Sequence, residues 1–164
     1  MKLLEWSGYK KLELIYRATR DGTLSKKFHE KCDNQGPTIT LIKNEKGNIF
    51  GGFSSVSWTC HGDYKQAPNS FLFTLSNIYG INPTKFQLKD NNSSFAIYDN
   101  SSCGATFGGG NDLHINNDFF NNNDTYSYFP SSYEDSIGKG KSIFTGDQNN
   151  KYFKIKEIEV FKLY

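Results

Sequence analysis

The sequence predicts a mainly β fold, a sandwich of two antiparallel sheets with a few short flanking helices, and three features support this. Aromatic residues are unusually common, with 14 Phe, 10 Tyr and 2 Trp, and aromatic side chains favour sheets. Short alternating apolar stretches are separated by turn residues, and only one segment has helical apolar spacing. With 164 residues and no internal repeat or linker, residues 1–164 are expected to form one domain.

The N-terminal part predicts a strand followed by the single helix. Residues 12–18 alternate between apolar and polar positions, as in a strand with one buried face. Leu24, Phe28 and Cys32 lie four residues apart, so residues 24–32 should form a helix with one apolar stripe.

A hairpin is expected next, with strands at residues 38–42 and 48–53 joined by a turn at 44–47. Gly51 and Gly52 lie inside its second strand. Glycine weakens a strand interior, so this pair predicts either a bulge or a segment that crosses closely.

The remaining chain adds short strands, and its last run is strongly strand-like. In residues 152–164 the apolar positions change parity twice, which predicts bulges near Lys156 and Val160. Residues 116–150 are expected to form loops, with the aromatic segment 126–130 packed against the body. Further strands are expected at residues 71–75, 86–88, 95–98 and 112–115.

The segment 96–115 begins and ends like a strand and is expected to form a glycine-rich loop between. The consecutive Gly108, Gly109 and Gly110 are costly to order, which predicts positive φ angles or a close approach of another segment. A phosphate-binding loop would need a lysine and a following helix, whereas here Asp112 and a strand follow. A tight crossing of backbones is therefore favoured over a nucleotide site.

Composition narrows the possible functions further. A net charge of +2, from 19 basic and 17 acidic residues, argues against nucleic-acid binding. No apolar stretch approaches the roughly 20 residues of a membrane span, and no secretory signal is recognised. We expect a cytoplasmic monomer whose three cysteines are reduced.

Neither a catalytic site nor a metal or cofactor site is predicted. The three histidines lie far apart in sequence, and we assign none of them a metal-ligand partner. His29 is expected to be hydrogen-bonded at the core edge and Cys32 to be buried. Cys103 is the one cysteine expected to be exposed, but Asp99 and Asp112 nearby would raise its pKa and disfavour a thiol enzyme.

Charged residues gather between the first strand and the helix. Arg17 and Arg20 are expected to anchor neighbouring loops by donating to backbone carbonyls, with Asp21 beside them. This role is architectural rather than catalytic.

An ordered set of motifs, each weak alone, resembles the TLDc domain over nearly the whole chain. The matching segments are Leu14-Ile-Tyr-Arg-Ala-Thr-Arg-Asp-Gly22, Phe28-His29-Glu-Lys-Cys32, Gly36–Ile42, Ile49–Trp58, Ser70–Leu75, Ala96–Asn100, Phe107–Leu113, Tyr126–Pro130 and Glu157–Phe161.

This resemblance implies a two-sheet sandwich and a non-catalytic regulatory role. TLDc members include the oxidation-resistance proteins, and several bind the vacuolar-type proton-pumping ATPase. The expectation is a protein-binding domain that meets the pump's peripheral subunits, recruited through them to vacuolar or endolysosomal membranes, and contributes to oxidative-stress protection. Two alternatives stay open: a thiol-dependent peroxide scavenger using Cys103, and a structural module of a larger assembly.

Overall fold

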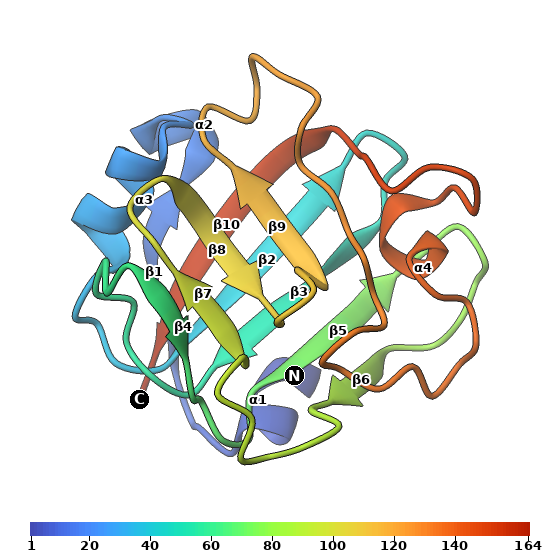
Figure 1. Ribbon diagram of the computed structural model, residues 1–164, viewed down its shortest axis with the longest axis horizontal. Coiled ribbons are helices and arrows are strands. Elements are labelled where there is room, and N and C mark those ends of the chain that lie inside the picture. Colours follow the sequence, from blue (N-terminus) through green and yellow to red (C-terminus); the bar gives the residue numbers. More distant parts are fainter.

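The computed structural model describes residues 1–164 and places a four-stranded antiparallel sheet over a six-stranded antiparallel sheet (Figure 1). The six-stranded sheet has the order β1 (Leu12–Arg17), β10 (Ile155–Leu163), β2 (Thr38–Asn44), β3 (Ile49–Ser54), β5 (Phe71–Ser76) and β6 (Thr84–Gln87). The four-stranded sheet has the order β4 (Asp63–Lys65), β7 (Ile97–Asp99), β8 (Cys103–Phe107) and β9 (Leu113–Asn116). The helices are α1 (Lys2–Ser7), α2 (Ala18–Asp21), α3 (Ser25–Cys32) and α4 (Ser142–Thr145). The predicted fold class is confirmed.

Most predicted elements are present, and the one predicted helix is α3. Leu24, however, precedes the first turn of α3 and is 44% exposed, so Phe28 and Cys32 form its buried stripe. None of the helices is long and apolar enough to cross a membrane.

Several short elements escaped prediction, namely α1, α2, α4, β4 and β8. The most consequential is β8, because residues 103–107 were expected to belong to a loop. All five are buried, and β8 pairs with both β7 and β9. A Cβ atom on Gly104 would lie 3.1 Å from Ile115 Cγ2, so the glycine allows close side-chain packing within the strand.

The largest apolar core lies between the two sheets, and Gly52 lies against a ring from the opposite sheet. A Cβ atom on Gly52 would lie 2.6 Å from the ring of Phe107 in the opposite sheet. On Gly51 it would lie 1.8 Å from the backbone oxygen of Thr40. The β2–β3 register continues without a shift through both glycines, and the β3–β5 shift lies before them, between Ile49 and Phe50. Of the two predicted reasons for the pair, close approach therefore applies at the glycines themselves.

A second apolar cluster covers the outer face of the six-stranded sheet, where Leu3 of α1 packs with Leu163 of β10. This explains the change of parity in the last strand. Val160 faces the core between the sheets and Leu163 faces α1, so no bulge is needed between them. The bulge predicted near Lys156 is confirmed, whereas the one predicted near Val160 lies instead at Ile15 on the neighbouring strand.

Candidate functional site

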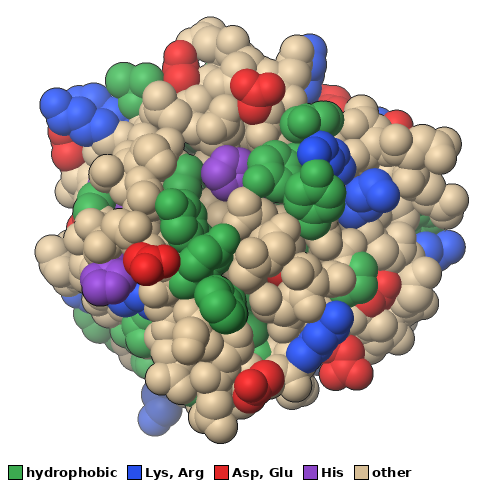
Figure 2. Space-filling view, viewed as in Figure 1, with side chains coloured by type: hydrophobic (Ala, Val, Ile, Leu, Met, Phe, Trp, Pro, Cys, Tyr) green, Lys and Arg blue, Asp and Glu red, His purple; other side chains and the backbone are tan.

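A row of side chains, here called the aromatic row, crosses the outer face of the four-stranded sheet. Successive strands place its members directly opposite one another, and isolated bridges extend it beyond β9. Their neighbours Ile97, Phe107 and Leu113 point into the core, so alternation turns the row outward. Figure 2 shows hydrophobic side chains gathered over this sheet. In spatial order the members are Tyr64, Tyr98, Thr106, His114, Tyr126 and Tyr152.

One end of the aromatic row holds a lysine among three tyrosines. Lys151 Nζ lies 5.2, 4.4 and 5.0 Å from the ring centroids of Tyr126, Tyr128 and Tyr152. Tyr128 and Tyr152 remain 49% and 42% exposed. His114 lies 4.8 Å from Tyr126 between ring centroids, and burial lowers the pKa of its imidazole, so it is uncharged at neutral pH. This end therefore presents one positive charge in an aromatic frame.

Phe95 extends the other end of the aromatic row and is 50% exposed. Its ring lies 5.1 Å from that of Tyr64, which lies 4.7 Å from Tyr98. The Tyr64 hydroxyl donates to the carbonyl of Gly109 at 3.2 Å and helps to fix the ring. Tyrosines held in place supply contact area at little entropic cost, and exposed aromatic clusters are typical of protein interfaces.

The glycine run lies against other segments at all three positions. Gly108 has φ 91°, and a Cβ atom there would lie 1.8 Å from Asp112 Oδ1. Gly109 has no positive φ, but its Cβ atom would lie 2.9 Å from Phe95 Cβ. On Gly110 it would lie 2.2 Å from Ser131 Oγ. Positive φ and close approach, the two predicted reasons for the run, are both present.

Asp112 fixes the segment that crosses the glycine run. Its buried carboxylate accepts the backbone N–H groups of Ser131, Ser132 and Tyr133 at 2.7, 2.9 and 3.1 Å. Burial raises the pKa of this carboxyl group, and the three N–H donors oppose that rise. Asp112 therefore holds residues 131–133 against the glycine run and is not an exposed contact residue.

The arginine prediction was wrong in its partners. Arg17 donates to Glu159 at 2.7 Å and Arg20 donates to Asp21 at 2.7 Å, so both guanidinium groups bind carboxylates rather than loop carbonyls. Asp21 also accepts the backbone N–H of Arg17 at 2.9 Å. The contacts of Asp21 close the turn between β1 and α3, whereas the Arg17–Glu159 pair joins β1 to β10. Both arginine side chains remain about half exposed.

The prediction that Cys103 is the exposed cysteine was wrong. Cys103 is 2% exposed, and burial raises the pKa of its thiol. Cys32 is buried as predicted, and the exposed cysteine is Cys60. The alternative of a peroxide scavenger using Cys103 therefore loses the accessibility that it required.

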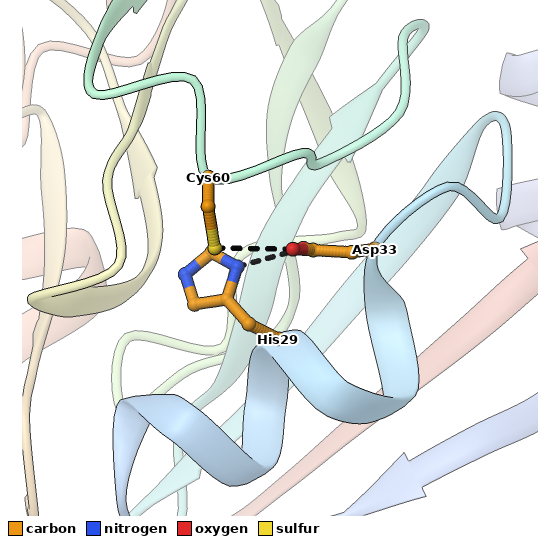
Figure 3. A group of neighbouring side chains, drawn as sticks. All are labelled: His29, Asp33 and Cys60. Atoms are coloured by element: carbon orange, nitrogen blue, oxygen red, sulfur yellow. Dashed lines mark hydrogen bonds and ion pairs between the residues drawn. The ribbon is translucent and has the colours of Figure 1, made fainter.

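Contrary to the expectation from the sequence, His29 has a potential metal-ligand partner four residues later, Asp33. Its Nδ1 lies 2.7 Å from Asp33 Oδ1, and the Cys60 thiol donates to Asp33 Oδ2 at 3.1 Å (Figure 3). The three potential ligand atoms lie within 4.8 Å of one another. As predicted, His29 is hydrogen-bonded at the core edge, with its Nε2 near two backbone carbonyls.

The comparisons with known proteins establish the family. The model of the TLDc domain matches residues 1–164, so the chain belongs to the TLDc family. Similar proteins include MTOR-associated protein MEAK7 of Danio rerio, 46% identical over 44 residues, which cover 27% of this chain and 10% of the relative. MEAK7 of Xenopus laevis is 35% identical over 52 residues, or 30% and 11%. MEAK7 of Gallus gallus is 29% identical over 65 residues, or 40% and 14%. The matches thus span only about a tenth to a seventh of these relatives.

The aromatic row was not predicted as a unit. Its members come from separate strands and bridges between positions 64 and 152, and only strand order and register bring them together. The one available signal was the high aromatic content combined with tyrosines at alternating strand positions.

Proposed function

We propose that this chain is a non-catalytic, regulatory protein-binding domain that meets its partner through the aromatic row. The proposal rests on the exposure of three large aromatic side chains at the two ends of the row, Phe95 at one end and Tyr128 and Tyr152 at the other. Large exposed aromatic side chains with fixed rings dominate binding energy at many interfaces. Lys151 adds a positive charge, which favours a partner with an acidic rim.

The first partner to test is the peripheral part of the vacuolar-type proton pump, which the resemblance to oxidation-resistance proteins suggests. The domain would act in the cytoplasm and reach vacuolar or endolysosomal membranes through that partner. Protection against oxidative stress would follow from regulation of the partner rather than from thiol chemistry.

A second candidate partner is mTOR, because the relatives carry the name MTOR-associated protein. The same protein-binding role serves both candidates, and they differ only in the partner. A purely structural role in a fixed assembly is the remaining alternative.

The experiment is a pull-down from cytosolic and vacuolar-membrane extracts, read by mass spectrometry, with the 164-residue chain as bait. The variant Tyr128→Ser/Tyr152→Ser removes two exposed rings at the Lys151 end of the row, Tyr152 from the row itself and Tyr128, which packs beside Tyr126. Ile78→Ser is the matched control, since Ile78 is 52% exposed and lies outside the row. Pump subunits that are captured by the parent and the control but lost with the double variant would support the proposal.

The other outcomes separate the alternatives. Enrichment of mTOR that depends on the same two tyrosines would keep the role and change the partner. Capture that is equal for the double variant and the parent would refute the row as the binding face. Survival of oxidative-stress protection in Cys103→Ser is expected, and its loss would return weight to the thiol alternative.

A further inference from the structure

The His29–Asp33–Cys60 cluster combines a nitrogen, an oxygen and a sulfur donor at one point of the surface. His29 and Asp33 lie at the end of α3, and Cys60 reaches them from the loop before β4 (Figure 3). Nitrogen, carboxylate and thiolate are the ligand types that Zn²⁺ prefers. We propose that these three side chains form a Zn²⁺ site, with His29 Nδ1, an Asp33 carboxylate oxygen and Cys60 Sγ as ligands.

The second nitrogen of His29 is already arranged as in metal sites. Nε2 lies 2.9 Å from the carbonyl oxygen of Asn100 and 3.0 Å from that of Cys103. A metal-bound histidine usually donates its other N–H to such a carbonyl, which fixes the ring orientation and leaves the first nitrogen for the metal. The ring is 7% exposed and packs against Phe28 at 4.9 Å, so its direction is fixed in advance.

The three ligand atoms, one from each residue, already lie within 4.8 Å of one another. His29 Nδ1 is 2.7 Å from Asp33 Oδ1, and Cys60 Sγ is 3.1 Å from the other carboxylate oxygen, Oδ2. Tetrahedral Zn²⁺ with usual bond lengths places its N, O and S ligands about 3.3–3.5 Å apart. The Cys60 side chain is exposed and can make most of this adjustment.

Zn²⁺ binds nitrogen and sulfur ligands in their deprotonated forms. Any hydrogen on His29 Nδ1 and the hydrogen on Cys60 Sγ would therefore leave to solvent as protons when the ion binds. The contacts of His29 Nε2 with the carbonyl oxygens of Asn100 and Cys103 would be kept.

The loop that carries Cys60 is fixed by hydrogen bonds to the buried side chain of Asp99. The buried carboxylate of Asp99 accepts the backbone N–H groups of Thr59 at 2.8 Å and of Cys60 at 3.1 Å. Lys65 pairs with the same carboxylate at 3.3 Å. Cys60 itself has φ 56°, an uncommon conformation for a residue other than glycine, which points its side chain at Asp33.

The fourth coordination position opens to solvent. The cluster lines an open pocket of about 330 Å³ whose other residues are Lys26, Glu30 and Ser101. This space accommodates a water ligand, or a side chain from a bound partner. Three protein ligands with one open position is the arrangement of reactive or exchangeable zinc sites rather than closed structural ones.

The test is a Zn²⁺ titration of the reduced 164-residue chain against a chromophoric chelator. We expect one equivalent of Zn²⁺ to bind, and Mg²⁺ at the same concentration not to compete. Cys60→Ser and Asp33→Asn should each weaken binding by more than about 100-fold, since loss of an outer-shell partner alone costs about 10–100-fold. His61→Asn, next to Cys60 but outside the cluster, is the matched control and should bind like the parent.

Two further readouts distinguish coordination from a folding effect. Co²⁺ should produce a sulfur-to-metal charge-transfer band that Cys60→Ser abolishes, while the thermal unfolding of metal-free Cys60→Ser stays close to that of the parent. Zn²⁺ should also protect Cys60 from alkylation. Failure of the parent to bind Zn²⁺, or equal binding by Cys60→Ser and the parent, would overturn the site without affecting the proposed protein-binding role.

Discussion

Replacing Gly108 with alanine tests the crossing at the glycine run most sharply. Gly108 has φ 91°, and a new Cβ atom would lie 1.8 Å from Asp112 Oδ1. The left-handed conformation costs about 1–2 kcal/mol for a residue with a side chain. Displacing the carboxylate from the Ser132 N–H adds about 1–3 kcal/mol, because a buried donor loses its charged acceptor. Gly108→Ala should therefore lower the free energy of unfolding by about 2–5 kcal/mol.

Gly138→Ala separates the two costs. Gly138 has a similar φ of 85°, but no atom lies within 4 Å of its added Cβ. It should lose only the conformational part, about 1–2 kcal/mol. Urea denaturation followed by tryptophan fluorescence measures the free energy of unfolding of both variants. In thermal unfolding, each kcal/mol lost should lower Tm by about 2–4 °C. If both variants lose the same stability, the close contact between position 108 and Asp112 contributes nothing.

Three further predictions follow from the core, the α2 turn and the thiols. Phe107→Ala should lower the free energy of unfolding in urea denaturation by about 3–5 kcal/mol, because the Phe107 ring fills the space over Gly52. Phe120 is exposed, so Phe120→Ala should cost far less. Equal losses for the two variants would contradict the packing of Phe107 against Gly52. The hydrogen bond from Arg20, helped by the Arg17 backbone, lowers the pKa of Asp21 to about 2, so the stability that it contributes is present above pH 4 and lost as pH falls toward 2. Asp21→Asn should thus lose about 1 kcal/mol at pH 7, after allowance for solvent screening, and less near pH 2; a loss independent of pH would refute the ion pair. In the metal-free, folded protein only Cys60 should react with iodoacetamide, because Cys32 and Cys103 are buried. The reaction should be slow at pH 7, because partial burial of the Cys60 sulfur and its hydrogen bond to Asp33 raise the pKa of the thiol to about 12. Detection of labelled Cys103 by mass spectrometry before unfolding would contradict this prediction.

The fold class could be predicted from the sequence because local signals carried it. The β2–β3 hairpin combines alternation with a turn, and α3 has its apolar stripe at Phe28 and Cys32, so neither depends on distant residues. β8 was missed because all of its residues are buried and small ones interrupt it, which removes both alternation and an apolar run. The changes of parity in β10 suggested an extra bulge near Val160, because the sequence does not show that α1 covers the second face of the sheet. With both faces covered, apolar residues of either parity are buried.

The candidate sites depended even more on tertiary structure. Only the strand register brings Tyr64, Tyr98 and Tyr126 into the aromatic row, and no local sequence pattern predicts that register. Cys60 reaches Asp33 across 27 positions for the same reason. The His29–Asp33 half of that cluster was readable, since residues four apart share a helix face. Asp112 was noticed for its charge, but its three backbone donors come from a segment about 20 residues away.

The central claim is that the aromatic row binds the partner, and the most direct test is an affinity comparison. Purified parent, Tyr128→Ser/Tyr152→Ser and Ile78→Ser would be titrated against the immobilised peripheral subunits of the vacuolar-type proton pump. Removing two exposed aromatic contacts should cost at least about 2 kcal/mol, or roughly 30-fold in Kd. We expect this loss for the double variant and an unchanged Kd for the Ile78→Ser control. Equal Kd values for the double variant and the parent would show that the aromatic row is not the binding face.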